Sequence, residues 1–261
     1  MARILVAGGT GALGSAVVRQ LQATDHHVRV LSRQPAPPNA PVEWAQGDVV
    51  TGDGLAAALD GIEIVANFTG DPQNAYAADV EGVGRLAEQA ARSGVRHFFH
   101  VSIVGIDYMD APYYRNKVQA EAGVIASGAP YSIQRLTQFH SLLDYWMRQA
   151  QHTPDGYVLR VERDVPFQPI DTRDAAAYLL PLLDAPAGRL PDAGGPEVLR
   201  FGEMARIYYA ARGIHDPVLL DPEKSMFPPG TIDAMRRGLH TAPAQRVGRI
   251  TWADYVRETI D

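Results

Sequence analysis

Residues 8–14, GGTGALG, constrain the fold of this chain more than any other stretch. They follow residues 2–7, a short apolar run with the pattern of a buried β-strand. They open residues 12–24, whose apolar side chains repeat at helical spacing. A glycine-rich loop between a strand and a helix is the first part of a βαβ unit. We therefore expect residues 2–24 to form the strand, turn and helix of an α/β domain.

The glycines of this loop fit two spacings that bind a dinucleotide. Gly9, Gly11 and Gly14 form G-x-G-x-x-G. Gly8, Gly11 and Gly14 form G-x-x-G-x-x-G. Both spacings provide a tight turn, a backbone that approaches a pyrophosphate, and close packing of the helix on the strand. The helix start then offers free N–H groups and a partial positive charge to the phosphates. Because a strand precedes the loop and a helix follows it, we expect a dinucleotide site rather than an ordinary tight turn.

Strand-like and helical runs alternate through the first 136 residues. Such alternation implies βαβ crossovers and a parallel sheet that is covered on both faces. We therefore expect an α/β protein with a Rossmann-type, doubly wound parallel sheet. After the first helix, the expected strands are 27–33, 42–48, 62–70, 95–102 and 130–136, and the expected helices are 54–61, 75–94 and about 113–127.

The alternation ends near residue 137, and proline and glycine are dense between residues 186 and 230. We expect residues 1–136 to form the dinucleotide-binding Rossmann core. Residues 137–261 are expected to form a mixed C-terminal region that contributes a small, irregular substrate lobe and closing helices. In this region the expected helices lie near 138–150, 172–184, 202–212, 231–238 and 251–260, and the expected strands are 157–161 and 165–171.

The composition argues against several classes of function. The 261 residues carry a net charge of −6 and no dense basic run, which argues against a nucleic-acid or anionic-membrane surface. Without cysteine there are no disulfides, thiolate metal sites or cysteine nucleophiles. We expect no metal site among the histidines either, because His97 and His100 lie on opposite faces of an expected strand. No run approaches the roughly 20 apolar residues of a membrane span, and no signal peptide is recognisable, so we expect a cytoplasmic protein.

The end of the second expected strand bears on the choice of cofactor. NAD sites usually carry an acidic residue there for the ribose hydroxyls, whereas this chain has Ser32 and Arg33. A guanidinium suits a 2′-phosphate, so NADP(H) is preferred. NAD(H) stays possible if Arg33 is only a solvated charge. Asp48, after the third strand, either accepts a hydrogen bond from the adenine amino group or serves as a turn residue before Gly52.

Residues 101–121, VSIVGIDYMDAPYYRNKVQAE, contain the candidates for proton transfer. Tyr113 and Lys117 are four apart on an expected helix and share one face. A nearby ammonium lowers the pKa of a phenol, whose ordinary value is about 10. Ser102, at the end of the fifth strand, could hold a substrate carbonyl. Tyr114 competes with Tyr113 for the role, and either tyrosine could instead only pack at the helix start.

These motifs together resemble the short-chain dehydrogenase/reductase superfamily, and most of all its atypical NmrA-like branch. The likeness includes ANFTG at the end of the fourth strand and extends over SGAPYSIQRLTQFH, PIDTRDAAAYL, GGPEVLRFGEMARIYYAARG and GRITWADYV, nearly the whole chain. It implies a Rossmann domain with a small C-terminal substrate lobe and NADP(H) or NAD(H) in the cleft. Ala7 stands where the family commonly has threonine, and many NmrA-like members lack the active tyrosine.

The resemblance also implies a role for individual residues. Gly8, Gly11 and Gly14 would hold the pyrophosphate, with Thr10, Ala12 and Leu13 beside it. The implied adenosine contacts are Ser32, Arg33, Asp48, Asn67, Phe68, Thr69 and Gly70. Ser102, Tyr113 and Lys117 fall on the catalytic positions, and Lys117 would also hold the nicotinamide ribose.

Two functions are expected from these features, and the first of them requires a small-molecule substrate. One is an NADP(H)-dependent oxidoreductase that transfers hydride to or from a small carbonyl, quinone or enone. The other is a non-catalytic dinucleotide sensor that binds a protein partner. Epimerase or dehydratase chemistry on a nucleotide sugar is less favoured, because no arginine cluster for a diphosphate is evident in the C-terminal region.

Other side chains in the C-terminal region have structural interpretations. Asp171 and Asp174 are expected to cap a helix start. Tyr208 and Tyr209 are expected in the core, and His140 is either a core residue or a substrate contact. An apolar substrate pocket is suggested by Phe139, His140, Trp146, Met226 and Phe227.

Overall fold

The computed structural model describes residues 1–71, 74–153, 156–215, 217–225 and 227–260. Contacts divide the chain into two compact units. Unit one comprises Met1–Ser102, Pro112–Arg135 and Ala175–Pro191. Unit two comprises Ile103–Ala111, Leu136–Asp174 and Asp192–Asp261. The units interleave along the chain, and the single boundary expected after residue 136 stays a prediction.

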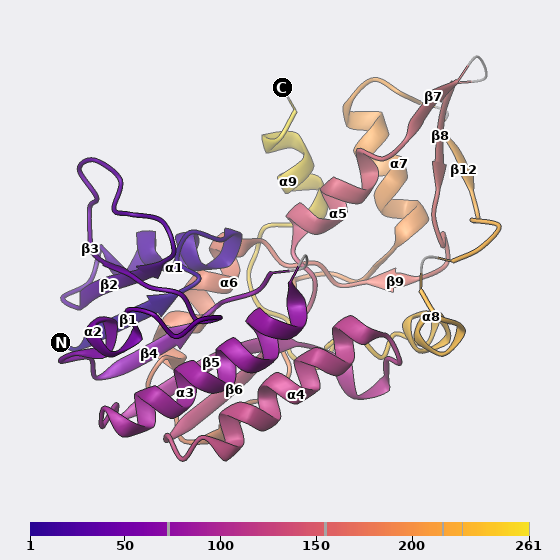
Figure 1. Cartoon of the computed structure of the whole chain (residues 1–261). Helices are drawn as coiled ribbons and strands as arrows, with labels where there is room; N and C mark the ends of the chain where they lie inside the picture. Colours follow the sequence, from indigo (N-terminus) through magenta and orange to yellow (C-terminus); the bar gives the residue numbers. More distant parts are fainter. Residues whose placement is uncertain (72–73, 154–155, 216, 226, 261) are drawn as a thin grey trace. The chain divides into compact units, whose positions relative to one another are not determined.

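A seven-stranded sheet forms the centre of unit one, in the order β10-β6-β5-β4-β1-β2-β3 (Figure 1). Its registered pairs are parallel. The chain runs from β1 outward through β2 to β3 and then returns to β4 on the other side of β1, which confirms the doubly wound Rossmann fold. The strands are β1 (Arg3–Ala7), β2 (His27–Ser32), β3 (Glu43–Gln46), β4 (Ile64–Asn67), β5 (His97–Ile103), β6 (Tyr131–Leu136) and β10 (Gly188–Arg189).

The register brings the ends of three strands to one edge of the sheet. Ala7 at the end of β1 lies opposite Leu31 of β2 and Asn67 of β4. The reversal of strand order falls between β1 and β4, and ligands of open α/β sheets bind beyond the carboxyl ends of strands at such a reversal. The fold therefore places the glycine loop, which follows β1, where a ligand is expected.

Helices cover both faces of this sheet. On one face α3 lies beside α4 and packs against α2, whereas α1 packs against β1, β2 and the 3₁₀ turn η3 (Figure 1). The helical elements of unit one are α1 (Ala12–Leu21), α2 (Leu55–Leu59), the π-helix η1 (Tyr76–Gly82), α3 (Val83–Arg92), α4 (Pro112–Ala126), most of α6 (Thr172–Leu179) and η3 (Leu180–Leu182).

The expected single helix over residues 75–94 is wrong in one respect. The structure begins this segment with the π-helix η1 and changes to α-helix at Val83. A π-turn inserts an extra residue into the helical repeat, so it shifts which side chains face the sheet. The periodicity of the sequence gave no sign of this change.

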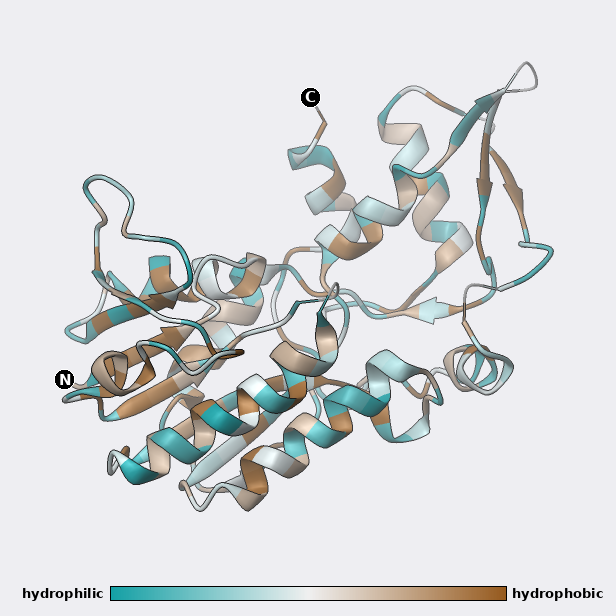
Figure 2. Cartoon of the chain, in the orientation of Figure 1, coloured by the Kyte–Doolittle hydropathy of each residue, from teal (hydrophilic) through white to brown (hydrophobic). Residues whose placement is uncertain are grey.

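The core of unit one lies between the sheet and helices α2 to α4. Leu5, Val65 and Phe98 from the strands meet Leu86 and Val124 from the helices, all essentially inaccessible to water. Figure 2 shows strands β1 and β4 as hydrophobic, whereas α3 and α4 carry hydrophilic residues on their outer faces. This is the burial pattern that stabilises a layered α/β domain.

A buried ion pair ties α4 to the sheet. Arg135 of β6 donates from Nε and Nη2 to the two carboxylate oxygens of Glu121, at 2.7 and 2.6 Å. Both side chains are buried, so the bidentate geometry offsets a large desolvation cost. The pair fixes the helix that carries Tyr113 and Lys117.

Unit two is built of shorter elements. Strands β7 (Gln151–Thr153), β8 (Gly156–Arg160) and β12 (Val218–Leu220) form one sheet in the order β12-β8-β7, and β9 (Pro166–Phe167) pairs with β11 (Leu199–Arg200). The expected strand over 165–171 shortens to β9. Pro169 lies within the expected range and lacks the N–H that a continuing ladder needs. The helical elements are η2 (Ile106–Tyr108), α5 (His140–Met147), α7 (Phe201–Ala211), α8 (Pro229–Arg236) and α9 (Trp252–Glu258).

The two expected capping aspartates behave differently. Asp171 accepts a hydrogen bond from the Arg173 N–H at 2.8 Å at the start of α6, which confirms a cap. Asp174 instead accepts from the N–H groups of Arg249 and Ile250, at 2.7 and 2.8 Å. Asp174 is therefore not a cap, but it lies in the first turn of α6, where the helix dipole favours a carboxylate, and it stabilises the loop before α9. Among the helices of the described residues, none has the length and apolar character for crossing a membrane.

Candidate functional site

A cavity of about 240 Å³ opens beside the glycine loop in unit one. It is bounded by the segments that follow β1, β2, β3 and β4, so its position matches the ligand site of a doubly wound sheet. Nine of the predicted cofactor residues line it, namely Gly8, Thr10, Gly11, Ser32, Arg33, Asp48, Phe68, Thr69 and Gly70. Ala12, Leu13, Gly14, Asn67 and Lys117 do not.

The glycine loop needs glycine for two separate reasons. Gly8 has a φ of +77°, and a Cβ there would lie 2.6 Å from the backbone of Phe68. A Cβ on Gly14 would lie 2.2 Å from the carbonyl oxygen of Gly8. The loop thus folds back on the first turn of α1, which brings the backbone close to the cavity.

The start of α1 can hold an anion. Gly11 precedes the helix in an extended conformation, so the N–H groups of Ala12, Leu13 and Gly14 lie in the first turn, where a helix has no internal acceptors. This turn carries no acidic side chain. Leu13 and Gly14 are buried and can contribute only backbone groups. The donors and the helix dipole fit a pyrophosphate.

The residues after β2 and β3 form the polar side of the cavity. Ser32 accepts a hydrogen bond from the Gln34 N–H at 3.1 Å. Arg33 is 64% exposed, and its Nη1 lies 3.8 Å from a carboxylate oxygen of Asp71. Asp48 accepts from the Val50 N–H at 2.8 Å, which is a turn interaction within its own loop. Asp48 therefore serves as a turn residue, and it also lines the cavity.

Asn67 orients the turn after β4 and does not line the cavity. Its Oδ1 accepts from the hydroxyl of Thr69 at 2.8 Å, and its Nδ2 lies 2.9 Å from Nδ1 of His100. Both Asn67 and His100 are fully buried. Burial, followed by the charge of Lys117, lowers the pKa of His100 to about 3, so its imidazole is neutral. His100 was considered from the sequence only as a metal ligand, and the described residues contain no cluster of three metal-ligating side chains.

Lys117 is buried and paired with a residue that the sequence did not indicate. Its Nζ lies 2.8 Å from Oδ2 of Asp79. Asp79 belongs to the π-helix η1 and is 1% exposed, and its Oδ1 accepts from the Asp71 N–H at 3.3 Å. A Cβ on Gly70 would be 3.8 Å from both Lys117 Nζ and Asp79 Oδ1. Lys117 thus reaches the turn that borders the cavity.

The structure reverses the expected electrostatics of Tyr113. Lys117 Nζ lies 5.5 Å from the centre of the Tyr113 ring. The pKa of Tyr113 is nevertheless raised above its ordinary value, first by loss of hydration and then by the charge of Asp79 and the neighbouring Tyr114. Burial, and after it the charge of Asp79, thus outweighs the lowering that we expected from Lys117. Tyr113 as a whole is 40% exposed, although its hydroxyl group has lost much of its hydration.

Tyr114 lies against Tyr113 but differs from it in environment. The two rings meet edge to face, with centres 5.5 Å apart. Burial raises the pKa of Tyr114 to about 12. The cation–π contact of Lys117 is with Tyr113, which favours Tyr113 as the residue that works with the lysine.

Ser102 lies on β5, two residues after His100, so both side chains project from the same face of the sheet. Ser102 is 3% exposed, and its hydroxyl has no hydrogen-bond partner among the described residues. A buried hydroxyl without a partner is costly unless it serves a ligand or water. Its role stays a prediction.

The candidates in unit two separate into core and cavity residues. His140 is buried between Trp252 and Tyr255, which favours the core interpretation. Tyr208 and Tyr209 are buried, as expected. Of the residues expected around an apolar pocket, Trp146 and Phe227 line a cavity in this unit, whereas Phe139 and His140 are not part of its lining. Met226 lies outside the described residues.

Comparison with known proteins adds three findings. A family model described as NAD(P)H-binding matches residues 8–186. The (4-alkanoyl-5-oxo-2,5-dihydrofuran-3-yl)methyl phosphate reductase of Streptomyces griseus is 32% identical over 208 residues, which cover 77% of this chain and 71% of that protein. The NAD(P)H azoreductase of Xenophilus azovorans is 30% identical over 221 residues, which cover 80% of this chain and 74% of that protein.

A solved structure agrees with the fold. A short-chain dehydrogenase/reductase superfamily protein from Agrobacterium tumefaciens, with bound NAD, superimposes with a TM-score of 0.75. The match covers 98% of this chain and 95% of that one, at 21% identity. At this identity the likeness concerns the fold.

Proposed function

This chain belongs to the NAD(P)H-binding family of atypical short-chain dehydrogenases/reductases, and from that premise we propose that it is an NADPH-dependent reductase. Its substrate would be a small carbonyl, quinone or enone. The observation that carries the proposal is the cluster of Tyr113, Lys117 and Asp79 beside the glycine-loop cavity. Membership of the NmrA-like branch stays a prediction.

The residues around the cavity fit a dinucleotide. Gly8, Gly11 and Gly14 would hold the pyrophosphate with the first turn of α1, and the turn at 68–70 would lie along the adenosine. The exposed guanidinium of Arg33 supports a preference for NADP(H), since it could exchange Asp71 for a 2′-phosphate. NAD(H) would bind without that contact.

Tyr113 acts in this proposal as an acid. Its raised pKa keeps the hydroxyl protonated at neutral pH, so it can donate a proton and cannot readily accept one. When bound, the reduced nicotinamide supplies the hydride. A carbonyl that gains this hydride at carbon takes the Tyr113 proton at oxygen and becomes an alcohol. The protonated phenol is the form that this reduction step uses.

Lys117 and Ser102 would support this step. The Lys117 ammonium has three donors, so it can keep Asp79 as a partner and still donate to a ribose hydroxyl. The hydroxyl of Ser102 lacks a partner among the described residues and could donate to the substrate carbonyl. The names of the two reductase relatives support the direction of the reaction, and the dihydrofuranone in one name supports an enone substrate.

The test compares Tyr113→Phe with Tyr114→Phe. NADPH oxidation is followed by absorbance with a quinone, an aldehyde, an unsaturated lactone and an azo dye as substrates. Loss of the proton donor should reduce kcat by roughly 100- to 10,000-fold in Tyr113→Phe. NADPH affinity should stay within a few-fold, and Tyr114→Phe should retain most activity. Unchanged turnover in Tyr113→Phe would show that Tyr113 is not the acid.

The pairing of Lys117 with Asp79 also favours a second candidate, a dinucleotide sensor without turnover. A sensor needs the lysine at the ribose but no reactive phenol. Tight NADPH binding with no oxidation of the cofactor by any compound of the panel would favour this candidate over the reductase.

A further inference from the structure

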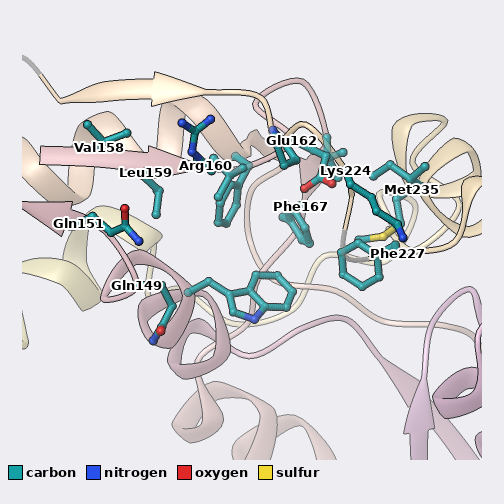
Figure 3. Close-up of a pocket in the computed structure, with 16 residues that line it drawn as sticks. Gln149, Gln151, Val158, Leu159, Arg160, Glu162, Phe167, Lys224, Phe227 and Met235 are labelled. Atoms are coloured by element: carbon teal, nitrogen blue, oxygen red, sulfur yellow. The ribbon is translucent and has the colours of Figure 1, made fainter.

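Unit two contains a second cavity, of about 300 Å³, that shares no residue with the glycine-loop site. Its described lining comes from α5, β7, β8, β9, α7 and α8 and from the loops that follow α5, β8 and β12. Every lining residue belongs to unit two. Figure 3 shows Leu159 and Gln151 extending toward the open space, with Phe167 and Phe227 on its border. We propose that this cavity binds a neutral, flat, apolar molecule that carries one hydrogen-bond donor.

Aromatic rings form one wall of the cavity. Trp146 meets Phe167, Phe201 and Phe227 edge to face, with ring centres 5.9, 6.0 and 6.3 Å apart. Such walls favour flat aromatic ligands, whose rings can stack on or meet the edges of these side chains. An apolar cavity of about 150 Å³ holds a benzene molecule. A cavity twice that size therefore suits two fused rings.

The polar groups on the lining specify the donor. One carboxylate oxygen of Glu162 is buried and has no hydrogen-bond partner among the described residues. Glu162 also lines the cavity and is only partly buried, so its carboxylate can accept a hydrogen bond from a ligand O–H or N–H. Glu162 is the only acidic residue on the described lining.

The mixed charges on the lining favour a neutral ligand over an ion. An anionic ligand would face the Glu162 carboxylate. A cationic ligand would enter a cavity that is also lined by Arg160 and Lys224, two exposed cations. A neutral donor avoids both repulsions, so the ligand chemistry is that of a phenol or a neutral heteroaromatic N–H.

The experiment uses the full chain and three two-ring probes. Binding of 2-naphthol, 2-methoxynaphthalene and 2-naphthoate is measured by calorimetry, with tryptophan fluorescence as a second readout through Trp146. We expect 2-naphthol to bind about tenfold more tightly than 2-methoxynaphthalene, because only the hydroxyl can donate to a charged acceptor. The anionic 2-naphthoate should bind most weakly. No difference between 2-naphthol and 2-methoxynaphthalene would overturn the role of Glu162.

Variants make this test specific. Glu162→Leu should weaken 2-naphthol about tenfold and leave 2-methoxynaphthalene unchanged, since only one hydrogen bond is lost. The matched control, Glu223→Leu, changes an exposed glutamate that does not line the cavity and should alter neither affinity. Val158→Phe adds a ring at the cavity wall and should abolish binding of both probes. Equal effects of Glu162→Leu on both probes, or full binding in Val158→Phe, would contradict the proposal.

The result is separable from the proposed reductase activity. Neither Glu162 nor Val158 belongs to the glycine-loop site, and Tyr113→Phe should bind 2-naphthol as the parent chain does. Loss of probe binding with intact NADPH oxidation would refute the second cavity alone. Intact probe binding in a chain that never oxidises NADPH would refute the reductase alone.

Discussion

The two cavities of this chain are built by opposite means. In unit one the walls are glycine backbone, turn residues and charged side chains, and the helix start supplies N–H groups. In unit two the walls are mainly aromatic and aliphatic side chains, together with two glutamines, two cations and Glu162. A backbone site is encoded by consecutive residues, because the chain itself makes the contact. A side-chain cavity is assembled from distant segments, so it has no short motif.

Two carboxylates, one in each unit, show the same contrast. Asp79 in unit one forms an ion pair with Lys117, and its charge adds to the effect of burial in raising the pKa of Tyr113. Glu162 in unit two keeps one buried oxygen without a partner among the described residues. A carboxylate paired with a lysine organises its own site, whereas one that lines a cavity can accept a hydrogen bond from a ligand.

The largest expected effect is on NADPH affinity, and it comes from a substitution at Gly14 that should leave the second cavity unchanged. In Gly14→Ala the new Cβ would overlap the carbonyl oxygen of Gly8, so the loop must move away from the phosphates. Overpacking of this kind should weaken NADPH binding by about 100-fold, measured by fluorescence titration. Binding of 2-naphthol should not change.

The control for this change is Gly84→Ala. Gly84 lies in α3, and a Cβ there would meet nothing within 4 Å. This variant should raise stability by about 0.5–1 kcal/mol through helix propensity and leave NADPH affinity alone. Similar NADPH affinities in the two alanine variants would show that the loop geometry does not determine binding.

A smaller effect is expected at Arg33. Arg33→Ala should weaken NADPH about tenfold and leave NADH unchanged, because a charged hydrogen bond to the 2′-phosphate is lost at an exposed position. The exposed Arg19 on α1 provides the control substitution to alanine. If the parent chain binds NADH and NADPH equally well, the preference for NADP(H) is wrong.

The smallest expected effect concerns the pH dependence of kcat for the proposed reduction. A proton donor is active below its pKa, and the pKa of Tyr113 lies above the ordinary 10.0, so reduction should decline only above pH 10. Asp79→Asn removes the negative charge and leaves Lys117 unpaired, which lowers the pKa of Tyr113 and moves the decline of kcat to lower pH. The exposed Glu88→Gln should leave the profile in place. A shift to higher pH would contradict the role assigned to Asp79.

The sequence predicted the regular parts of the fold because their signals are local. Strands β1, β2, β5 and β6 lie within two residues of their expected ranges, since each is an apolar run bounded by turn residues. The π-helix was not predicted, because its residues carry the same apolar spacing as an α-helix. Strand β12 was missed for the opposite reason, since its three residues lie in a proline-rich stretch.

The same limit applies to the candidate site. Gly8 and Gly14 were predicted because their contacts lie within the loop and its neighbouring turn. Asp79 was missed because only the fold brings it to Lys117, and its segment has no recognisable motif. The pKa of Tyr113 is raised first by burial and then by Asp79, and both depend on the fold, so the direction of the shift was not predicted.

The chain passes between its two units five times, because three segments of unit one alternate with three segments of unit two. No single cut therefore releases either unit whole, and a truncated gene would encode parts of both. Exchange of the second cavity between relatives by recombination would need several coordinated junctions. The ligand specificity of the two cavities is thus expected to change by single substitutions rather than by exchange of whole segments.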